Sequence, residues 1–133
     1  MIKTKELKNN VVVLLTIILL WPSLAFADLA SWYSSNDACG AKTNNHKGCP
    51  TASGESLFRL EREGQLFAAS NDYPLRTRLQ VTNIANGRSV EIIVLDRGNF
   101  KKKYNRIIDL GKLAFSKIAD TKQGVINVKV EIA

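Results

Sequence analysis

The residues best suited to chemistry lie in one turn, Asp96-Arg97-Gly98, which directly follows an apolar run at residues 92–95. An aliphatic run of this length, rich in β-branched residues, predicts a buried strand. The turn therefore delivers a carboxyl group at the point where a buried strand reaches the surface. A carboxyl group held there can donate or accept a proton, which makes Asp96 the candidate for acid–base chemistry. In isolation, the same three residues are also typical of an ordinary strand-ending turn.

The geometry of a strand predicts how Asp96 is presented. Side chains alternate between the two faces of a strand, so an Asp96 that shares the face of Val94 leaves Arg97 pointing away from the carboxylate. Gly98 permits a positive φ that its neighbours resist, which suits a tight turn after the strand. We therefore expect a carboxylate that is positioned by the fold and not neutralised by the adjacent arginine.

A second aspartate, Asp109, directly precedes a helical pattern. The apolar residues that follow it at helical spacing are Leu110, Leu113, Ala114 and Ile118. An acidic side chain in that position is typical of a helix N-cap. Asp109 is therefore predicted to be a cap, whereas Asp96 is predicted to do the chemistry.

Short strands must position these residues. Alternating or apolar β-forming residues predict strands at residues 29–33, 79–82, 89–95 and 125–132. Asn86-Gly87 is a hairpin signal between two of them, and a short helix is predicted near residues 56–63. Several short strands with only one or two helices favour an all-β barrel over a sandwich.

Several ordered motifs resemble one family. They are Ala30-Ser31-Trp32-Tyr33, Thr51-Ala52-Ser53-Gly54-Glu55, residues 79–83, Asn86-Gly87-Arg88-Ser89-Val90, Asp96-Arg97-Gly98, residues 106–110, and the final strand. In this order they resemble the RlpA-like family of bacterial cell-wall proteins, which includes lytic transglycosylases. The resemblance covers nearly everything after residue 28. It implies that residues 28–133 form a six-stranded double-psi β-barrel with one or two short helices.

The resemblance also implies site residues. The family's proposed catalytic acids, the Asp of a DRG motif and the Glu that ends a second motif, correspond to Asp96 and Glu55. A His of a third motif corresponds to Ser70, which can hydrogen-bond a carboxylate or a sugar hydroxyl but cannot carry a proton at neutral pH. The candidate catalytic residues are Asp96 and Glu55, and the candidate substrate-binding residues are Ser70, Arg97 and Thr51.

Lytic cleavage of peptidoglycan needs few protein groups. The hydroxymethyl oxygen of muramic acid closes onto its own anomeric carbon, so one acid with a raised pKa can suffice. The leading interpretation is an exported endolytic transglycosylase with Asp96 as general acid and Glu55 as its partner. Two alternatives stay open. One is a non-catalytic glycan-binding or wall-loosening module of the expansin or barwin type, favoured by the missing His, and the other is an inhibitor or interaction protein of a wall enzyme.

The N-terminus predicts export. Three lysines precede an apolar run at residues 11–21, and Ala25-Phe26-Ala27 supplies a small-residue cleavage site. Residues 1–27 are therefore predicted to be a signal peptide that is cleaved after Ala27, although a retained anchor is the alternative. The next residue is Asp28 and not Cys, which argues against a lipoprotein. We expect a periplasmic or secreted domain without stable membrane insertion.

The charge and composition of the chain limit its partners. The formal net charge is +7, and part of it belongs to the predicted signal peptide. A modest positive excess favours a polyanionic surface such as a bacterial envelope, and export argues against nucleic acid. We expect a monomer that acts on peptidoglycan glycan strands and uses no cofactor.

Cys39 and Cys49 are the only cysteines of the sequence. In an oxidising compartment, two cysteines that bracket a polar loop predict a disulfide. A metal site formed by Cys39, His46 and Cys49 is the alternative, but a closed zinc site needs a fourth protein ligand. The disulfide is the preferred interpretation, and no metal is expected.

Overall fold

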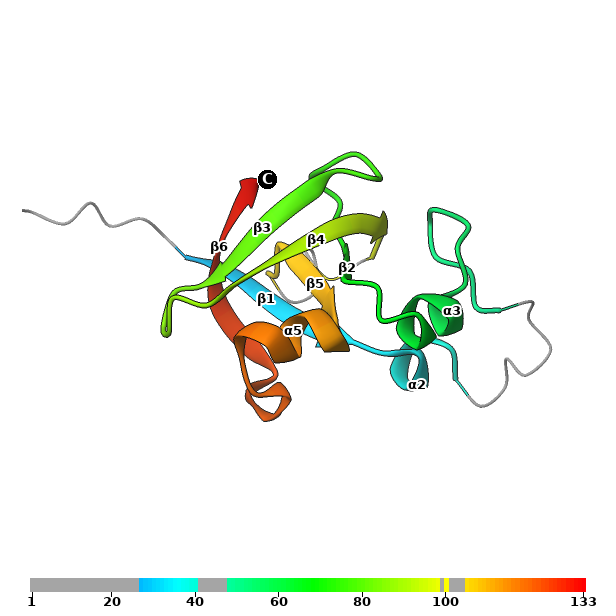
Figure 1. Cartoon of the computed structure of the whole chain (residues 1–133), viewed down its shortest axis with the longest axis horizontal. Coiled ribbons are helices and arrows are strands. Elements are labelled where there is room, and N and C mark those ends of the chain that lie inside the picture. The colour runs from blue at the N-terminus through cyan, green and yellow to red at the C-terminus, as the bar shows by residue number, and fades with distance from the viewer. Residues whose placement is uncertain (1–26, 41–47, 99, 101–104) are drawn as a thin grey trace, which may run out of the picture.

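The computed structural model describes residues 27–40, 48–98, 100 and 105–133, in which six strands close into a barrel (Figure 1). The strands are β1 (Asp28–Tyr33), β2 (Phe67–Ala69), β3 (Arg78–Asn83), β4 (Ser89–Asp96), β5 (Ile108–Gly111) and β6 (Val125–Ile132). Their order around the barrel is β1-β5-β2-β4-β3-β6. The predicted fold class, an all-β six-stranded double-psi β-barrel, is confirmed.

The short strand β2 connects the two halves of the barrel. It pairs in parallel with β4 and antiparallel with β5, and β5 pairs in parallel with β1. Strand β3 forms antiparallel pairs with β4 and with β6. Strand β6 also pairs antiparallel with β1, and this pair closes the barrel. One wall of the barrel therefore consists of β1, β5, β2 and β4, which are far apart in the sequence.

Alternate residues of the strands fill the barrel interior. In β6, Ile126 and Val128 are buried whereas Asn127 and Lys129 are exposed, as the sequence pattern predicts. The interior cluster also contains Ala30, Ala68, Leu79, Val81, Val90, Ile92, Val94, Ile108, Leu110, Ala114, Phe115 and Ile118. Burial of this apolar surface is the main favourable contribution to folding.

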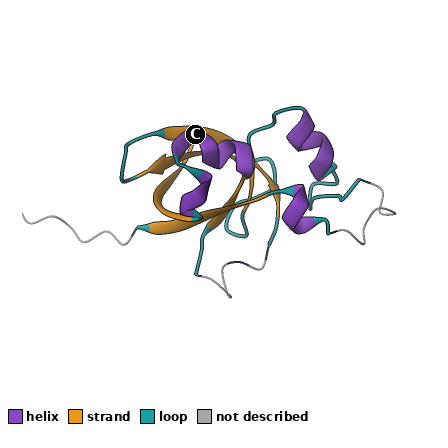
Figure 2. Cartoon of the chain, turned by 90° about the horizontal axis from the view of Figure 1, so that it is seen from below, coloured by secondary structure: helices purple, strands orange, loops and turns teal. Residues whose placement is uncertain are grey.

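Three short helices and one 3-10 turn accompany the barrel. They are α2 (Ser35–Ala38), α3 (Leu57–Arg62), α5 (Lys112–Ile118) and the 3-10 turn η2 (Thr121–Gln123). Helix α5 packs on the barrel, and α2 and α3 lie together beyond one end of it (Figures 1 and 2). The helix predicted near residues 56–63 is confirmed as α3. Among the described residues, none of the helices is long and apolar enough to span a membrane, and residues 1–26 of the predicted signal peptide lie outside them.

A second apolar cluster lies on the outer face of the barrel wall. Leu57 and Leu60 of α3 pack there with Phe67 of β2 and Leu95 of β4, and Cys39 completes the cluster. Side chains outside a barrel need a cover to be buried, and α3 supplies it. The outer face of this wall is therefore partly shielded from water by α3.

The predicted disulfide is confirmed. Cys39 and Cys49 are bonded, with an S–S distance of 2.01 Å, and the bond ties the end of α2 to the segment that leads into α3. Because both sulfur atoms are in the bond, neither is free to bind a metal. His46, the remaining ligand of the alternative metal site, lies outside the described residues.

The predicted helix cap at Asp109 is wrong. Asp109 lies in the middle of β5, and α5 begins at Lys112 with Gly111 as its N-cap. The backbone around Asp109 pairs with β1 on one side and with β2 on the other. These long-range pairs decide the local structure, so the helical spacing of the following residues applies only from Lys112 onward.

Gly98 does not adopt the positive φ that a glycine permits, because its φ is not in the left-handed region. A Cβ atom at this position would lie 2.6 Å from a ring carbon of Phe100, which is buried. The glycine is therefore needed for the close approach of that ring to the backbone.

The disulfide closes a short loop and should stabilise the domain by restricting the unfolded chain. Replacing both cysteines, Cys39→Ser with Cys49→Ser, is expected to lower the free energy of unfolding by about 2–3 kcal/mol. Urea denaturation monitored by circular dichroism measures this. A reductant should bring the unaltered protein to the stability of the double variant and leave the variant unchanged. Equal stability of the two proteins in the absence of reductant would contradict the prediction.

Candidate active site

The centre of the site is a row of four residues across the outer face of the barrel wall. Ser31 of β1 pairs with Asp109 of β5, Asp109 pairs with Ala69 of β2, and Ala69 pairs with Asp96 of β4. Since neighbouring strands lie about 4.8 Å apart, the Cα atoms of the two aspartates are separated by about 10 Å. The small side chain of Ala69 lies between the two acids and leaves the space above it open.

A bulge in β4 places Asp96 in this row. Ala68 pairs with Val94, but Ala69 pairs with Asp96, so the register skips Leu95. Val94 points into the barrel core, and Leu95 belongs to the outer cluster. Without the bulge, Asp96 would follow Val94 into the interior. Asp96 therefore does not share the face of Val94, which was the condition for the expected orientation of Arg97, and the bulge is the reason.

The carboxylate of Asp96 is held by three hydrogen-bond donors. The hydroxyl of Tyr33 donates to Oδ2 at 2.9 Å, and the backbone N–H groups of Ala52 and Arg97 each donate to Oδ1 at 2.9 Å. Carboxylates accept hydrogen bonds through both oxygens when ionised. The position of Asp96 is therefore fixed by donors from β1, from the turn before α3 and from its own strand end.

Tyr33 contacts both Asp96 and the outer apolar cluster. Its ring contacts Phe67 edge-on, with the ring centroids 5.9 Å apart. Burial raises the pKa of the Tyr33 phenol above its ordinary value, and the nearby carboxylate of Asp96 raises the pKa further. The phenol therefore keeps its proton and remains a hydrogen-bond donor to Asp96.

Asp109 is a second acid of the site, which the sequence analysis missed. Ser31 Oγ donates to Asp109 Oδ1 at 2.7 Å. Burial raises the pKa of Asp109, and the negative charges of Asp96 and Asp37 raise it further. The hydrogen bond from Ser31 and the positive charge of Arg106 lower the pKa, but the net shift is upward. The alternation of Ile108, Asp109 and Leu110, apolar on either side of an acid, is the strand signal that could have revealed it.

A cavity of about 290 Å³ lies beside the two acids. Its lining consists of Tyr33, Asp37, Ala38, Ala69, Asp96, Arg97, Gly98, Phe100 and Asp109. This volume is at the lower end of the range for small-molecule pockets. The described residues contain no group of three or more His, Cys, Asp or Glu side chains that could hold a metal ion. The cavity therefore offers acid–base chemistry and an open position between two carboxyl groups.

The turn that carries Glu55 is attached to the same end of β4. Ser53 N donates to the carbonyl of Leu95 at 3.0 Å, next to the bond from Ala52 to Asp96. Glu55 itself forms an ion pair with Arg76, with 3.2 Å between Oε1 and Nη1. The structure thus brings Glu55 and Asp96 to one end of the barrel, but Glu55 is not among the residues that line the cavity.

The three candidate substrate-binding residues occupy different environments. Thr51 is buried, and its hydroxyl donates to the carbonyl of Glu55 within the turn. Ser70 is fully buried, and its hydroxyl accepts a hydrogen bond from the N–H of Asp72. Arg97 is exposed, lines the cavity and donates to the carbonyl of Ser70. Of the three, only Arg97 lines the cavity.

Comparisons with known sequences agree on one family. The model of a family described as lytic transglycolase matches residues 25–130. A protein of Rickettsia felis named endolytic peptidoglycan transglycosylase RlpA is 40% identical over 102 residues, which cover 77% of this chain and 40% of that protein. A Nostoc protein named probable endolytic peptidoglycan transglycosylase RlpA is 37% identical over 109 residues, which cover 82% of this chain and 26% of that protein. The chain thus spans less than half the length of these curated relatives.

Comparisons with solved structures agree on the fold. The Streptomyces papain inhibitor matches with a TM-score of 0.53 and 21% identity, over 79% of this chain and 89% of that one. A Clavibacter michiganensis expansin in complex with cellohexaose matches with a TM-score of 0.55 and 17% identity, over 80% of this chain and 49% of that one. At these identities the likeness concerns the fold alone.

The raised pKa of Asp109 predicts a pH dependence of stability. The folded protein holds this proton more tightly than the unfolded chain, so stability should fall as the pH rises from the ordinary Asp value of about 4 through the raised pKa. The slope from one such group is at most about 1.4 kcal/mol per pH unit. Denaturation of the protein and of Asp109→Asn at several pH values measures the difference.

Asn at position 109 can still accept the Ser31 hydrogen bond but cannot ionise. The stability of the variant relative to the unaltered protein should therefore increase across this pH window, whereas the exposed substitution Asp28→Asn should leave the profile unchanged. Parallel pH profiles for Asp109→Asn and the unaltered protein would contradict the raised pKa.

Proposed function

Because the chain belongs to the lytic transglycolase family, whose model matches residues 25–130, we propose that it cleaves peptidoglycan glycan strands as a lytic transglycosylase. The names of relatives that are 37–40% identical support this substrate and reaction. The observation that carries the proposal is the placement of Asp96 and Asp109 on either side of Ala69, beside one cavity.

The reaction transfers one proton within the substrate. The bond between the anomeric carbon of muramic acid and the oxygen of the next sugar breaks, and the hydroxymethyl oxygen forms a new bond to the same carbon. The hydroxymethyl proton leaves, and the departing oxygen gains a proton, so no water is consumed. Such a reaction needs a proton donor on one side of the breaking bond and an acceptor on the other.

The two aspartates fit these two tasks. Asp109 has a raised pKa because it is buried, so it is the better proton donor. Asp96 accepts hydrogen bonds on both carboxylate oxygens, which suits an acceptor that stays in a fixed orientation. In the proposed mechanism Asp109 protonates the leaving oxygen and Asp96 receives the hydroxymethyl proton. The proton returns from Asp96 to Asp109 before the next cycle.

Glu55 is proposed to support the site from its edge. Its ion pair with Arg76 and the hydrogen bonds of its turn to the end of β4 help to hold the Ala52 N–H against Asp96. Ser70 contributes through its backbone, since its N–H donates to the carbonyl of Asp96 at 3.1 Å. The proposed proton transfers therefore do not pass through the serine that replaces the family's histidine. Arg97, at the cavity, is proposed to contact the substrate.

Digestion of purified peptidoglycan and of peptide-free glycan strands, analysed by mass spectrometry, tests the activity. We expect products that end in an anhydro-sugar. Asp96→Asn and Asp109→Asn should each lower the rate by about 10²–10⁴-fold, the usual contribution of a general acid or base. Glu55→Gln should cause a smaller loss, and the exposed substitution Asp28→Asn serves as the control.

Failure to form anhydro products at high enzyme concentration would overturn the proposed function. A glycan-binding module without catalysis would instead sediment with the cell wall, and Asp96→Asn would not abolish this binding. If only Asp96→Asn, and not Asp109→Asn, removed activity, the proposed division of roles between the two acids would be wrong.

Export is proposed for the same protein, because the pattern of residues 1–27 is that of a signal peptide. Expression in a bacterium with an outer membrane should yield a periplasmic or secreted form that begins at Asp28. Mass spectrometry of the intact exported protein measures this end. Recovery of the full-length chain in the membrane fraction would support a retained anchor instead.

A further inference from the structure

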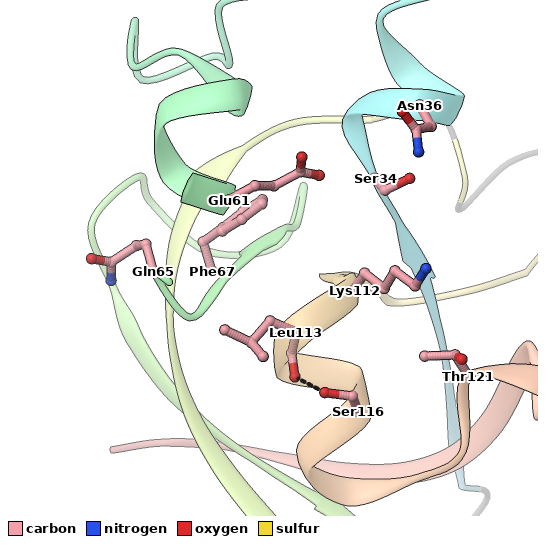
Figure 3. A pocket seen from close by; sticks show the side chains of 9 residues that line it. All are labelled: Ser34, Asn36, Glu61, Gln65, Phe67, Lys112, Leu113, Ser116 and Thr121. Carbon is pink, nitrogen blue, oxygen red and sulfur yellow. Dashed lines mark hydrogen bonds between the residues drawn. The ribbon is translucent and has the colours of Figure 1, made fainter. Parts of the chain in front are cut away.

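A second and larger cavity, of about 470 Å³, lies where β1 and β5 end and β2 begins. Its lining includes Ser34, Glu61, Phe67, Lys112, Leu113 and Thr121. Figure 3 shows Phe67 and Leu113 on one side of the cavity, and Lys112 and Thr121 on the other. Glu61 and Gln65 lie on the side of Phe67, so this side combines apolar and polar groups, and the other side carries a cation and a hydroxyl group.

This cavity and the candidate active site lie along the same face of the barrel wall. Phe67 is two residues before Ala69 on β2, so both side chains are on the outer face. Lys112 is three residues after Asp109, a distance of roughly 10 Å along an extended chain. The edge-on contact between Tyr33 and Phe67 lies between the two cavities. A chain of linked sugars that is bound at Asp96 and runs along this face toward Phe67 would reach the second cavity.

Lys112 is the cation among the residues that line this cavity. Its ammonium group lies 5.2 Å from the centre of the Trp32 ring, a cation–π contact, and no carboxylate of the described residues pairs with it. Glu61, the acid of the cavity, is already engaged, because its oxygens accept hydrogen bonds from the N–H and the hydroxyl of Ser35. The cavity can therefore accept a negatively charged group without first breaking an ion pair.

We propose that this cavity is a second substrate subsite, in which Lys112 binds the carboxylate of a muramic acid residue or of a peptide attached to it. The proposal rests on the proposed function, since peptidoglycan supplies such a group. A lactyl group carries a methyl beside its carboxylate, which matches a cavity that holds both the apolar side chains of Phe67 and Leu113 and the ammonium group of a lysine. The contact with Trp32 holds the ammonium in place before the ligand binds.

Binding of small sugars, measured by NMR on the full chain, tests this subsite without the need for catalysis. The indole N–H of Trp32 donates to the carbonyl of Thr121 at 2.9 Å, so its signal reports on the wall that carries Lys112. N-acetylmuramic acid is expected to shift this signal, and N-acetylglucosamine, which lacks the lactyl carboxylate, is not. Lys112→Gln should weaken binding about tenfold, the loss expected for one charge-assisted hydrogen bond.

Lys117→Gln is the matched control, because Lys117 is an exposed lysine of the same helix that does not line the cavity. N-acetylmuramoyl dipeptide separates the two carboxylate sources. Stronger binding of the dipeptide through Lys112 assigns the cavity to the peptide, and stronger binding of the monosaccharide assigns it to the free lactyl group. Either result supports the subsite.

Equal shifts with N-acetylglucosamine, or binding unaffected by Lys112→Gln, would overturn the subsite. Glycan cleavage by the same preparation would then show that the proposed function stands without it. Conversely, binding that depends on Lys112 in a protein that forms no anhydro product would retain the subsite and refute the catalytic proposal.

Discussion

The pairing of β2 with two different partners is the constraint on which the site depends. This strand has only three residues, yet it pairs in parallel with β4 and antiparallel with β5. As a result, Ala69 has an acid on each side, one from each partner strand. A larger side chain than alanine at this position would fill the space that the two carboxyl groups share. The strand pairs that close the barrel at β2 are therefore the same pairs that bring the two acids together.

The dry surroundings of the wall give the two acids different properties. The outer apolar cluster and the one-turn helix α2 cover part of this face, so Tyr33 and Asp109 are partly shielded from water and their pKa values rise. Asp96 has several hydrogen-bond donors around it, including two backbone N–H groups, whereas the hydrogen bond described for Asp109 comes from a single serine. Burial thus acts on Asp109 and fixed donors orient Asp96, and on this basis the proposed mechanism gives the two residues opposite roles.

The sequence predicted the features that depend on local pattern. Alternation identified the strand that ends at Ile132, the polar loop between the cysteines indicated the disulfide, and Asp96 was recognised as the acid at a strand end. The errors concern features that depend on distant pairing. The bulge that turns Asp96 outward is defined by its register against Ala69, and the strand at Asp109 exists because β1 and β2 flank it. Neither partner can be inferred from neighbouring residues. The prediction for Ser70 concerned its hydroxyl group, whereas the hydrogen bonds that link Ser70 to Asp96 and Arg97 are made by its backbone N–H and carbonyl.

The arrangement of charges along the wall relates the two cavities to each other. Three aspartates, Asp37, Asp96 and Asp109, and one arginine, Arg97, line the candidate active-site cavity, so an anionic ligand would meet more negative than positive groups there. Lys112 in the neighbouring cavity contacts the ring of Trp32 and forms no ion pair among the described residues, so the proposed subsite would give an anionic substituent of the same substrate a favourable position. Opposite charges at two points of one face would therefore fix the direction and register of a glycan that carries a carboxylate on some of its sugars.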